Sequence, residues 1–397
     1  MALTSSGSIN IQAIVGEFGG TAPHALSEYY RNGGEVPGNN TNVPESGEIK
    51  LSDFYGAVNE IQQTYNSNAT NLNLSTIFGS NWGTAVPKRV TINSGVTIGA
   101  TGSNYAINVP SGMGGTLVID NNGNVQGYGG AANGGTGGNA IHCTQTSGVT
   151  INNASGATIK SGGGGGGKGG TGGTGGNGGA GGAGGNGRSA QYTGQINQGY
   201  GNISGVCQQQ HGSWPNGGYY QNVLAGYGYF GAYYRQNCYR YIIHNGGAGG
   251  AGGSSGGAGG AGGNGGVGQG YNQSSGSGVS GVGGSSGGAG SSGSSGSGSG
   301  SGNGGSGGSR GNGGTGGTGG NGGSFGNAGA NGATGNQGAT GGTGSAGTNG
   351  NYTNGASGSN GSTGSAGSSG QSGGAAGYYI YNRNSITFNN SGTVAGN

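Results

Sequence analysis

Side chains that could bind a ligand gather in one segment of the chain, residues 188–245. This segment holds ten of the 21 tyrosines, together with Trp214, two histidines and three arginines. Tyrosine and tryptophan give rigid contact area with a polar atom and stack on sugar rings, and arginine pairs with anionic groups. The composition predicts a binding surface, and its candidate contact residues are Trp214, Tyr219, Tyr220, Tyr227, Tyr229, Tyr233, Tyr234, Arg235, Tyr239, Arg240 and Tyr241.

A plainer interpretation of the same segment is that many of its rings form a small core of their own, because it holds few aliphatic residues. Two cysteines, Cys207 and Cys238, flank most of the aromatic cluster. A disulfide between them would close a loop of about 30 residues and stabilise it by roughly 3 kcal/mol at best. Two buried free thiols are the equal alternative.

Carboxylates are missing from this part of the chain, which argues against catalysis. The last acidic residue is Asp120, whereas glycoside hydrolysis usually requires a pair of carboxylic acids. A serine esterase built on His211 or His244 would lack an acidic partner to orient the imidazole. Lys168 is followed by two glycines, not by the Ser or Thr of a phosphate-binding loop. We therefore expect no enzymatic activity and no cofactor.

A metal site is not expected either. Cys143 lies next to His142, but a metal centre needs more convergent Cys, His or carboxylate ligands than the sequence offers. Cys143 is therefore predicted to be a buried residue of a β region.

A repeat of glycine at every third residue predicts the scaffold that must hold residues 188–245. Every third residue from Gly302 to Gly350 is glycine, and no proline follows Pro215. A three-residue period is typical of left-handed extended helices, which make no internal hydrogen bonds and must pack against neighbours. With 119 glycines and only 28% hydrophobic residues in the chain, we expect a bundle of polyglycine II helices over residues 161–187 and 246–376.

The turns of this bundle are expected where the period slips or where a large residue interrupts it. One such slip occurs at Ser255, after Ala248, Ala251 and Ser254. A single line of 49 residues at about 3.1 Å rise would reach roughly 150 Å. The segment from residue 302 to 350 is therefore predicted to fold back near Arg310 and again between Phe325 and Gln337.

Residues 61–160 are predicted to form a β-repeat domain. Its unit is a strand, an Asn-rich turn and a second strand, as in residues 90–98 and 117–125. Alternating Val, Ile and Thr favour half-buried strands, and the Asn and Gly residues favour turns. Because a further copy occupies residues 386–394, residues 377–397 are expected to return and complete this domain. The glycine-rich region would then be one long insertion whose two ends lie together.

Residues 1–60 contain a repeat of another kind, since residues 6–16 align with residues 46–56. Each copy reads as a short alternating strand that leads into a helical turn. The overall expectation is a mostly β or irregular fold. It comprises a small N-terminal α+β module, a β-repeat domain and a polyglycine II bundle, which carries residues 188–245 as an aromatic loop insertion.

Charge and hydropathy narrow the list of partners. Seven basic residues and no acidic ones follow Asp120, so a weakly positive surface favours anionic partners such as acidic glycans. The basic residues are too dispersed for a nucleic-acid interface. No apolar stretch is long enough to insert into a membrane, and the first residues do not resemble a signal peptide.

Taken together, the glycine-rich motifs and the variable aromatic segment resemble the distal tail-fibre adhesins of T-even-type bacteriophages. The sequence at residues 46–56 is similar to a segment that recurs in tailed-phage virion proteins, and residues 377–380 leading into 386–388 are similar to the ends of phage fibre proteins. In this family, polyglycine II helices pack in a layered sandwich and loops contact the host receptor. The resemblance implies a virion protein of the tail fibre or tail tip.

The same resemblance implies partners at both ends. Residues 1–60 would attach to other tail or fibre proteins, and residues 188–245 would bind a host surface glycan or outer-surface protein without catalysis. Two alternatives remain at this point. One is a structural fibre or baseplate component in which the Tyr-rich insert mediates subunit packing. The other is an ice-binding protein that presents Thr171, Thr174, Thr315 and Thr318, against which the N-terminal module and the aromatic insert both argue.

Overall fold

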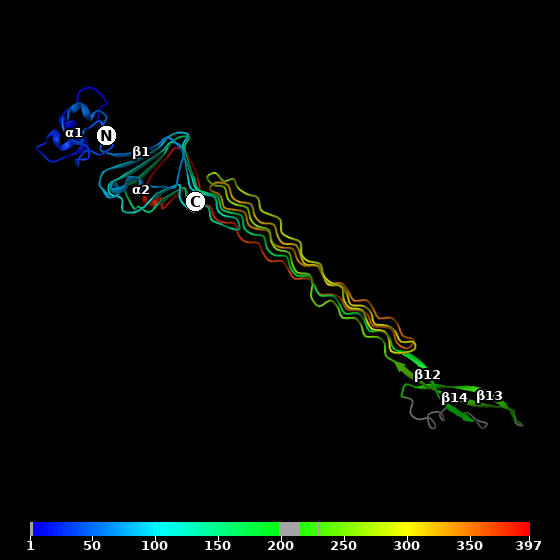
Figure 1. Ribbon diagram of the computed structural model, residues 1–397. Helices are drawn as coiled ribbons and strands as arrows, with labels where there is room; N and C mark the ends of the chain where they lie inside the picture. Colours follow the sequence, from blue (N-terminus) through cyan, green and yellow to red (C-terminus); the bar gives the residue numbers. More distant parts are fainter. Residues whose placement is uncertain (1–2, 103, 198–214, 229–230) are drawn as a thin grey trace.

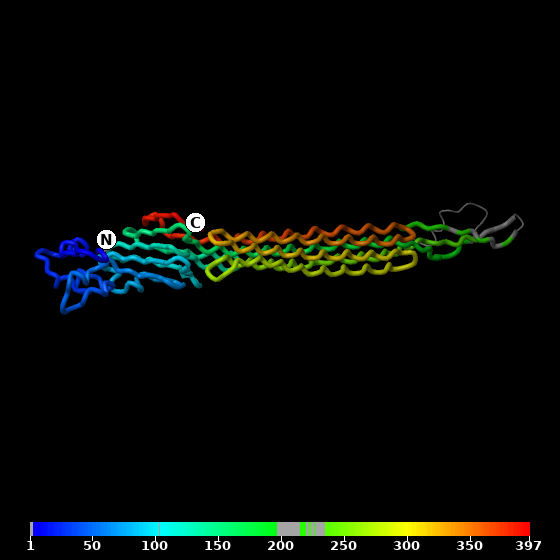
Figure 2. The backbone as a smooth tube through the Cα atoms, turned by 90° about the horizontal axis from the view of Figure 1, so that it is seen from above, coloured from blue at the N-terminus to red at the C-terminus, as the bar shows by residue number. Residues whose placement is uncertain are grey.

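The computed structural model describes residues 3–102, 104–197, 215–228 and 231–397, and shows an elongated molecule (Figures 1 and 2). An N-terminal module lies at one end and a small sheet lies at the other. Between them are a domain of parallel strands and a long rod of extended glycine-rich segments. The fold is mostly β with few helices, as expected.

The N-terminal module is built from short helices around a compact apolar core. Helix α1 (Ile11–Phe18) begins at Asn10, whose side chain accepts a hydrogen bond from the backbone N–H of Ala13 at 2.8 Å. Its inner face packs with the 3₁₀ turns η1 (Leu26–Tyr29) and η2 (Leu51–Phe54). Residues 3–60 contain no strand, only one isolated bridge between Arg31 and Val36. The expected α+β character of this module is therefore wrong, because the residues before each helical turn find no strand partner.

Next comes a solenoid in which each coil adds one strand to each of three parallel sheets. The sheets have the orders β1-β4-β7-β10-β16, β2-β5-β8-β11-β17 and β3-β6-β9-β15. Helix α2 (Leu74–Phe78) and turn η3 (Gly79–Gly83) follow the first coil. The strands are β1 (Ile61–Tyr65), β2 (Ala69–Thr70), β3 (Leu72–Asn73), β4 (Lys88–Ile92), β5 (Thr97–Gly99), β6 (Ile107–Val109), β7 (Leu117–Asn121), β8 (Asn124–Gln126), β9 (Ile141–Cys143), β10 (Val149–Asn153), β11 (Thr158–Lys160), β15 (Ile380–Tyr381), β16 (Thr387–Asn390) and β17 (Thr393–Ala395).

The solenoid interior is a stack of aliphatic side chains in register. Along β4, β7 and β10 every second residue is buried, and Val90, Ile119 and Ile151 lie at the same level of successive coils. The ends of the strands are joined by an asparagine ladder. Asn121 Nδ2 donates to Asn153 Oδ1, and Asn153 Nδ2 donates to Asn390 Oδ1, each at 2.8 Å. The first pair is 32 residues apart in sequence and the second 237, so the ladder bridges the whole glycine-rich insertion.

The rod is an insertion at one corner of the solenoid. The chain leaves after β11 and re-enters at β15, which pairs with β9, while β16 and β17 pair with β10 and β11. The same corner is crossed by the connection from β5 to β6 in the second coil and by residues 127–140 in the third. The third crossing is itself a short glycine-rich hairpin, in which the Gly138 N–H donates to the Tyr128 carbonyl at 2.8 Å. The connection between the second and third sheets thus becomes longer from coil to coil, and in the fourth coil it is the rod.

Six extended segments form the rod in its described residues, and they pack in two layers of three. The first segment lies between the second and the sixth in one layer, and the fourth lies between the third and the fifth in the other. Neighbours are joined by a backbone hydrogen bond at every third residue, such as Gly172 N–H to Gly260 O at 2.9 Å. In chain order the segments are residues 162–186, 246–269, 276–297, 302–323, 327–350 and 353–377.

The number of glycines in each triplet follows the number of neighbours. The first and fourth segments each contact four others and carry two glycines in most triplets, whereas the sixth contacts two others and mostly carries one. A Cβ built at Gly172 would overlap the carbonyl oxygen of Gly314, and one built at Gly173 would overlap that of Ser365. Glycine is therefore required wherever another backbone lies against the segment.

Serine, threonine and asparagine complete the hydrogen bonding of the rod. The N–H groups of Gly172, Gly173 and Thr174 point to three different neighbours, and the third donates to the Ser365 hydroxyl at 2.7 Å. Ala180 makes the same bond to Ser359, also at 2.7 Å. Such side chains of the sixth segment supply acceptors for N–H groups of the first segment.

Two turns expected from the glycine period are not present. The fourth segment runs straight through Arg310, and the second segment bends at Ser254 and Ser255 without reversing. Arg310 Nη1 donates to the Ser255 carbonyl at 3.1 Å, so the long side chain lies where the second segment accommodates its extra residue. A slip in the period therefore marks a packing adjustment here and not a turn. A reversal was expected between Phe325 and Gln337, and the chain reverses at the start of that range, between Ser324 and Asn327.

Candidate functional site

The rod carries a three-stranded antiparallel sheet at the end opposite the N-terminal module (Figures 1 and 2). It consists of β12 (Gly187–Asn197), β13 (Gly218–Gly228) and β14 (Gly231–His244), with β14 in the middle. The first rod segment continues into β12, and β14 leads into the second. The expected loop insertion is thus largely a sheet, since the alternating residues pair along the two long strands that flank β14.

One face of this sheet carries a row of tyrosines. Tyr239 in the central strand pairs with Tyr192 on one side and with Tyr219 on the other. The ring centroids of Tyr219 and Tyr239 are 4.9 Å apart and nearly parallel, while Tyr192 meets Tyr239 edge-on at 5.6 Å. Tyr241 extends the row, with its centroid 5.8 Å from that of Tyr219. Tyr192 and Tyr219 are 53% and 40% exposed, so this row presents ring surface to solvent.

Arg188 joins this tyrosine row to the end of the rod. Its guanidinium lies 3.9 Å from the ring centroid of Tyr241 and 5.0 Å from that of Tyr352, which belongs to the turn between the fifth and sixth rod segments. Backbone bonds fix the geometry, because the Arg188 N–H donates to Asn351 Oδ1 at 2.6 Å and Asn351 Nδ2 donates to the Arg188 carbonyl at 3.0 Å. A cation between two aromatic faces is stabilised by the ring quadrupoles.

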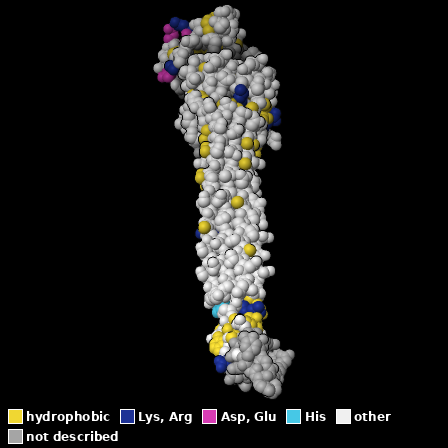
Figure 3. Space-filling view, turned by 90° about the vertical axis from the view of Figure 1, so that its right-hand side faces the viewer, with side chains coloured by type: hydrophobic (Ala, Val, Ile, Leu, Met, Phe, Trp, Pro, Cys, Tyr) yellow, Lys and Arg dark blue, Asp and Glu magenta, His cyan; other side chains and the backbone are white. Residues whose placement is uncertain are grey.

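We call Arg188, Tyr192, Tyr219, Tyr239, Tyr241 and Tyr352 the tip cluster. In Figure 3 basic and hydrophobic side chains gather at this end of the rod, while acidic side chains on the same face are seen at the N-terminal end. Arg240 lies on the opposite face, as alternation along β14 requires. Its Nε donates to Gln191 Oε1 at 2.7 Å. Asn237, two residues before Tyr239 and so on the tyrosine face, accepts from Gln195 Nε2 at 2.8 Å.

The sequence-based candidates therefore separate into four groups. Tyr219, Tyr239 and Tyr241 lie together in the tip cluster, whereas Arg235 and Arg240 are exposed side chains of β14 outside it. Trp214 and Tyr229 lie outside the described residues, as does Cys207. For the remaining four the structure gives the backbone position in β13 or β14 only, and these are Tyr220, Tyr227, Tyr233 and Tyr234.

Three members of the tip cluster were missed by sequence reasoning. Arg188 and Tyr192 lie in the predicted segment at even spacing, and reading β12 as a strand would have placed them on one face. Tyr352 could not be found in this way, because its position depends on where the rod turns. Cys238 is fully buried in β14, and its pairing with Cys207 stays a prediction.

Cys143 and His142 pack within the solenoid and contact its other residues. Cys143 is buried as expected, and burial raises the pKa of its thiol. The His142 ring lies between Tyr105 and Tyr381, with centroid distances of 4.0 and 4.9 Å, and hydrogen-bonds Asn108 at 3.1 Å. Burial lowers the pKa of His142. In the described part of the chain, no group of three or more His, Cys, Asp or Glu side chains could hold a metal ion.

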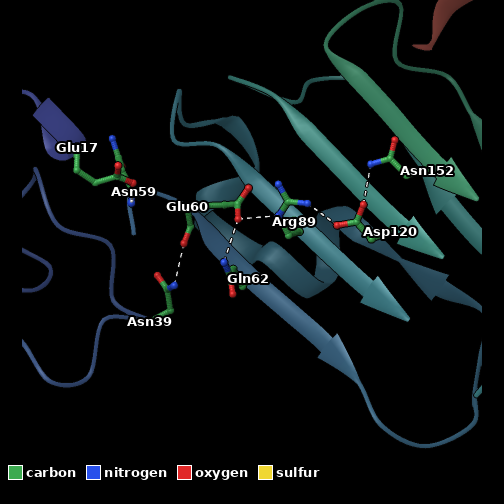
Figure 4. Close-up of polar contacts among 8 residues, drawn as sticks. All are labelled: Glu17, Asn39, Asn59, Glu60, Gln62, Arg89, Asp120 and Asn152. Carbon is green, nitrogen blue, oxygen red and sulfur yellow. Dashed lines mark hydrogen bonds and ion pairs between the residues drawn. The ribbon is translucent and has the colours of Figure 1, made fainter. Parts of the chain in front are cut away.

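A polar network ties the N-terminal module to the solenoid (Figure 4). Asn39 Nδ2 donates to the Glu60 carbonyl at 2.8 Å, and the Asn59 N–H donates to Glu17 at 3.0 Å. The Glu60 carboxylate accepts from Arg89 Nε at 2.8 Å. The module is thereby bonded to the first two coils by both backbone and side chains.

The same network continues across the outer face of the first sheet. Arg89 also bonds Asp120, and Asp120 accepts from Asn152 Nδ2 at 2.7 Å. Asn389 Nδ2 in turn donates to Asn152 Oδ1 at 2.8 Å. The hydrogen bond to Glu60 is the main reason why the pKa of Arg89 is raised. Because the network spans four coils, it couples the module to the C-terminal strand β16.

Comparisons with known proteins bear on the region from the solenoid to the tip. Residues 60–238 match the family model described as phage tail fibre adhesin Gp38. The resemblance to phage tail fibre adhesins is confirmed. The match to this adhesin family begins at the start of the solenoid and ends within β14, so it includes the first rod segment and most of the tip sheet.

A solved structure is also similar, the crystal structure of the gp37-gp38 adhesin tip complex of the bacteriophage S16 long tail fiber. It shares 15% identity with this chain, covers 99% of both chains and has a TM-score of 0.34. No curated protein sequence matches. As for membranes, no helix in the described ranges of this adhesin-like chain has the length and apolar character needed to cross one.

Proposed function

We propose that this protein is the tip adhesin of a phage tail fibre and binds a host cell-surface receptor without catalysis. The observation that carries the proposal is the position of the tip cluster. An exposed row of tyrosines with an arginine lies where the tip sheet joins the long rod, at the end of the molecule opposite the N-terminal module (Figure 1). Such side chains are enriched in recognition surfaces because they give contact area at low entropic cost.

The receptor would be a host glycan or an outer-surface protein. Beyond Asp120 the chain has no acidic residue, while Arg188, Arg235 and Arg240 lie in the tip sheet. This balance favours a receptor that presents anionic groups beside surfaces on which rings can stack. The absence of carboxylates also supports a role in binding and not in cleavage. We expect the purified protein to release no soluble saccharide from host polysaccharide, which reducing-end assays would check.

The opposite end would attach the adhesin to the virion. The module of residues 1–60 and the solenoid carry nearly all charged pairs of the described chain, including Arg31–Glu45 and Lys50–Glu48. The family model that matches residues 60–238 is described as a phage tail fibre adhesin, which supports a fibre protein as the partner here. The location would be the tail fibre. Truncation of residues 1–60 should abolish incorporation into virions and leave receptor binding intact.

We further propose that the six rod segments are polyglycine II helices. The support is the three-residue repeat of lateral hydrogen bonds between extended segments, together with the glycine spacing. Vibrational circular dichroism of the purified protein would check this, since left-handed threefold helices and parallel strands give amide bands of different shape.

The central experiment compares binding of two proteins to whole host cells. In one, residues 188–245 are replaced by a short Gly-Ser turn. The rod should tolerate this change because its first two segments remain bonded by Gly184 N–H to Gly247 O at 2.8 Å. Loss of binding by a folded protein supports the adhesin function. Binding that survives at full strength overturns the assignment of the tip.

Single substitutions sharpen this test. Tyr219→Ala should weaken binding by about tenfold or more if the tip cluster contacts the receptor. Tyr378→Ala is the matched control, since Tyr378 is an exposed tyrosine of similar accessibility beside the solenoid. Equal binding by both variants would exclude Tyr219 as a contact.

One observation favours a second function, that of a structural fibre component. The faces of Tyr219 and Tyr239 stack on each other, so part of the ring surface serves the sheet itself. In that case Tyr219→Ala would lower the melting temperature of the tip and leave host range unchanged. Exchange of residues 188–245 between related phages separates the two functions, because only an adhesin would transfer host range.

A further inference from the structure

The rod contains many Asn-Gly pairs, the dipeptide most prone to deamidation in water. In this reaction the backbone nitrogen of the glycine attacks the side-chain Cγ of the asparagine. A nitrogen–carbon bond forms, the Cγ–Nδ2 bond breaks, and the amide nitrogen leaves as ammonia. Water then opens the cyclic imide to aspartate or isoaspartate. The attack requires a glycine nitrogen that can lose its proton and approach Cγ, so a hydrogen bond that holds this N–H suppresses the reaction.

Nearly every Asn-Gly pair of the rod has its glycine N–H held. After Asn312 the Gly313 N–H donates to the Ser285 carbonyl at 2.9 Å, and after Asn331 the Gly332 N–H donates to the Gln371 carbonyl at 2.9 Å. The other glycines after asparagine with such a bond are Gly178, Gly246, Gly265, Gly304, Gly322, Gly350 and Gly355. Gly187, after Asn186, is the first residue of strand β12 and pairs with His244 of β14.

Asn360-Gly361 differs from these pairs. The Gly361 N–H has no acceptor within the part of the chain that the structure describes, and Asn360 is exposed at the edge of the sixth segment. The Asn360 side chain has one hydrogen bond, accepted from the Thr343 hydroxyl at 3.2 Å. This bond leaves Cγ accessible to the Gly361 nitrogen once the backbone rotates.

The neighbouring fifth segment explains the difference. At two other levels an asparagine of that segment accepts from a glycine of the sixth. Gly373 donates to Asn331 Oδ1 at 3.0 Å, and Gly355 donates to Asn349 Oδ1 at 2.9 Å. By the same antiparallel register, the residue against Gly361 is Thr343, whose shorter side chain bonds Asn360 instead.

We propose that Asn360 is the preferred site of spontaneous deamidation in the rod, because it is the Asn-Gly pair whose glycine N–H lacks an acceptor. The product matters for this fold in two ways. Aspartate would be the first carboxylate after Asp120 in the sequence. Isoaspartate would add one atom to the backbone and disturb the three-residue register by which Ser359 and Ser362 donate to the first segment.

The test is peptide mapping by mass spectrometry after incubation of the intact protein at mildly alkaline pH, where the glycine nitrogen loses its proton more readily. Asn360 should deamidate about fivefold faster than Asn312 or Asn331, the factor expected for one exposed backbone hydrogen bond. In urea the three sites should react at similar rates. Equal rates at the three sites in the folded protein would overturn the proposal.

A designed variant tests the cause. Thr343→Asn gives Gly361 the acceptor that Gly373 and Gly355 already have, so deamidation at Asn360 should slow to the rate of its neighbours. The new asparagine precedes Gly344, whose N–H is held by the Ser359 carbonyl at 2.9 Å, so no new site is created. Thr343→Ser is the control and should leave the rate at Asn360 unchanged. If Thr343→Asn also leaves it unchanged, the missing acceptor is not the cause.

Discussion

The solenoid and the rod are both built from extended chain, yet they are stabilised in different ways. In the solenoid, alternate side chains enter a closed interior, and Val90, Ile119 and Ile151 stack in register. In the rod the backbones themselves are the interior, so that a Cβ is excluded at the glycines that lie against another segment. One region depends on apolar burial and the other on hydrogen bonds between close-packed backbones. Four predictions test this contrast, in order from the largest expected change in stability to the smallest.

The largest effect is expected from a cavity in the solenoid. Ile119→Ala removes a fully buried side chain between two coils and should lower the free energy of unfolding by about 3–4 kcal/mol. Denaturant titration followed by near-ultraviolet circular dichroism would measure it. Thr150→Ala, on the outward-facing side of β10, is the control and should change little. A loss below about 1 kcal/mol would mean that the interior collapses around the gap.

In the rod the opposite change should lower stability, because an added methyl group overlaps the backbone of a neighbouring segment. Gly172→Ala places a Cβ against the Gly314 carbonyl and should destabilise the rod by about 2–3 kcal/mol. Gly283→Ala is the matched control, since a Cβ there meets no atom within 4 Å. It should be neutral or stabilise by up to about 1 kcal/mol. The same chemical change thus has opposite signs, and thermal unfolding of the two variants would show whether it does.

A smaller effect is expected from the side-chain acceptors at the layer edge. Ser365→Ala removes the oxygen that accepts from the Thr174 N–H at 2.7 Å. The bond is exposed, so water replaces it in part and the loss should be about 1 kcal/mol or less. Ser357→Ala in the same segment removes a hydroxyl without a partner among the described residues and should have no effect. Hydrogen exchange at Thr174 gives a local readout, and equal exchange in the two variants would contradict this role for serine.

The smallest effect concerns Lys88, a fully buried lysine whose Nζ donates to the carbonyls of Thr84, Val86 and Gly114 at 2.9–3.0 Å. Burial lowers its pKa. Between the lowered and the ordinary pKa the unfolded chain holds more protons than the folded one, so stability rises with pH through that window. Raised pKa values of Tyr29 and Tyr65 act in the opposite sense at higher pH.

The contribution of Lys88 is isolated by comparison with Lys88→Met. The wild type should gain stability relative to the variant as pH rises from the lowered pKa of Lys88 toward the ordinary lysine pKa of about 10.4. Chemical denaturation at several pH values would measure the difference. A difference that is constant with pH would mean that the three carbonyls compensate for the loss of water around the ammonium group.

The sequence predicted the fold of the solenoid and that of the rod to different extents. The alternation of Val, Ile and Thr placed strands in the solenoid because burial on one face leaves a period of two. The glycine period indicated close-packed segments and a reversal after Phe325, which occurs between Ser324 and Asn327. The glycine period did not indicate that the chain passes Arg310 without turning. The straight course depends on the space beside Ser255, where the second segment bends and the Arg310 side chain lies.

The tip was least predictable in its details. Composition pointed to residues 188–245, and Tyr219, Tyr239 and Tyr241 do lie together. The sequence did not separate Arg240 from them, although one residue of offset moves a strand side chain to the other face. Nor did it indicate Tyr352, which reaches Arg188 from a rod turn that no local pattern places there.

The position of the rod between β11 and β15 has a consequence for how long this molecule can be. Both ends of the insertion are anchored in adjoining coils, and all six segments run back and forth along one axis. Adding one triplet to every segment would lengthen the rod by about 9 Å, at a rise of about 3.1 Å per residue. Neither the solenoid nor the tip would need to change, so reach can vary in fixed steps independently of attachment and recognition.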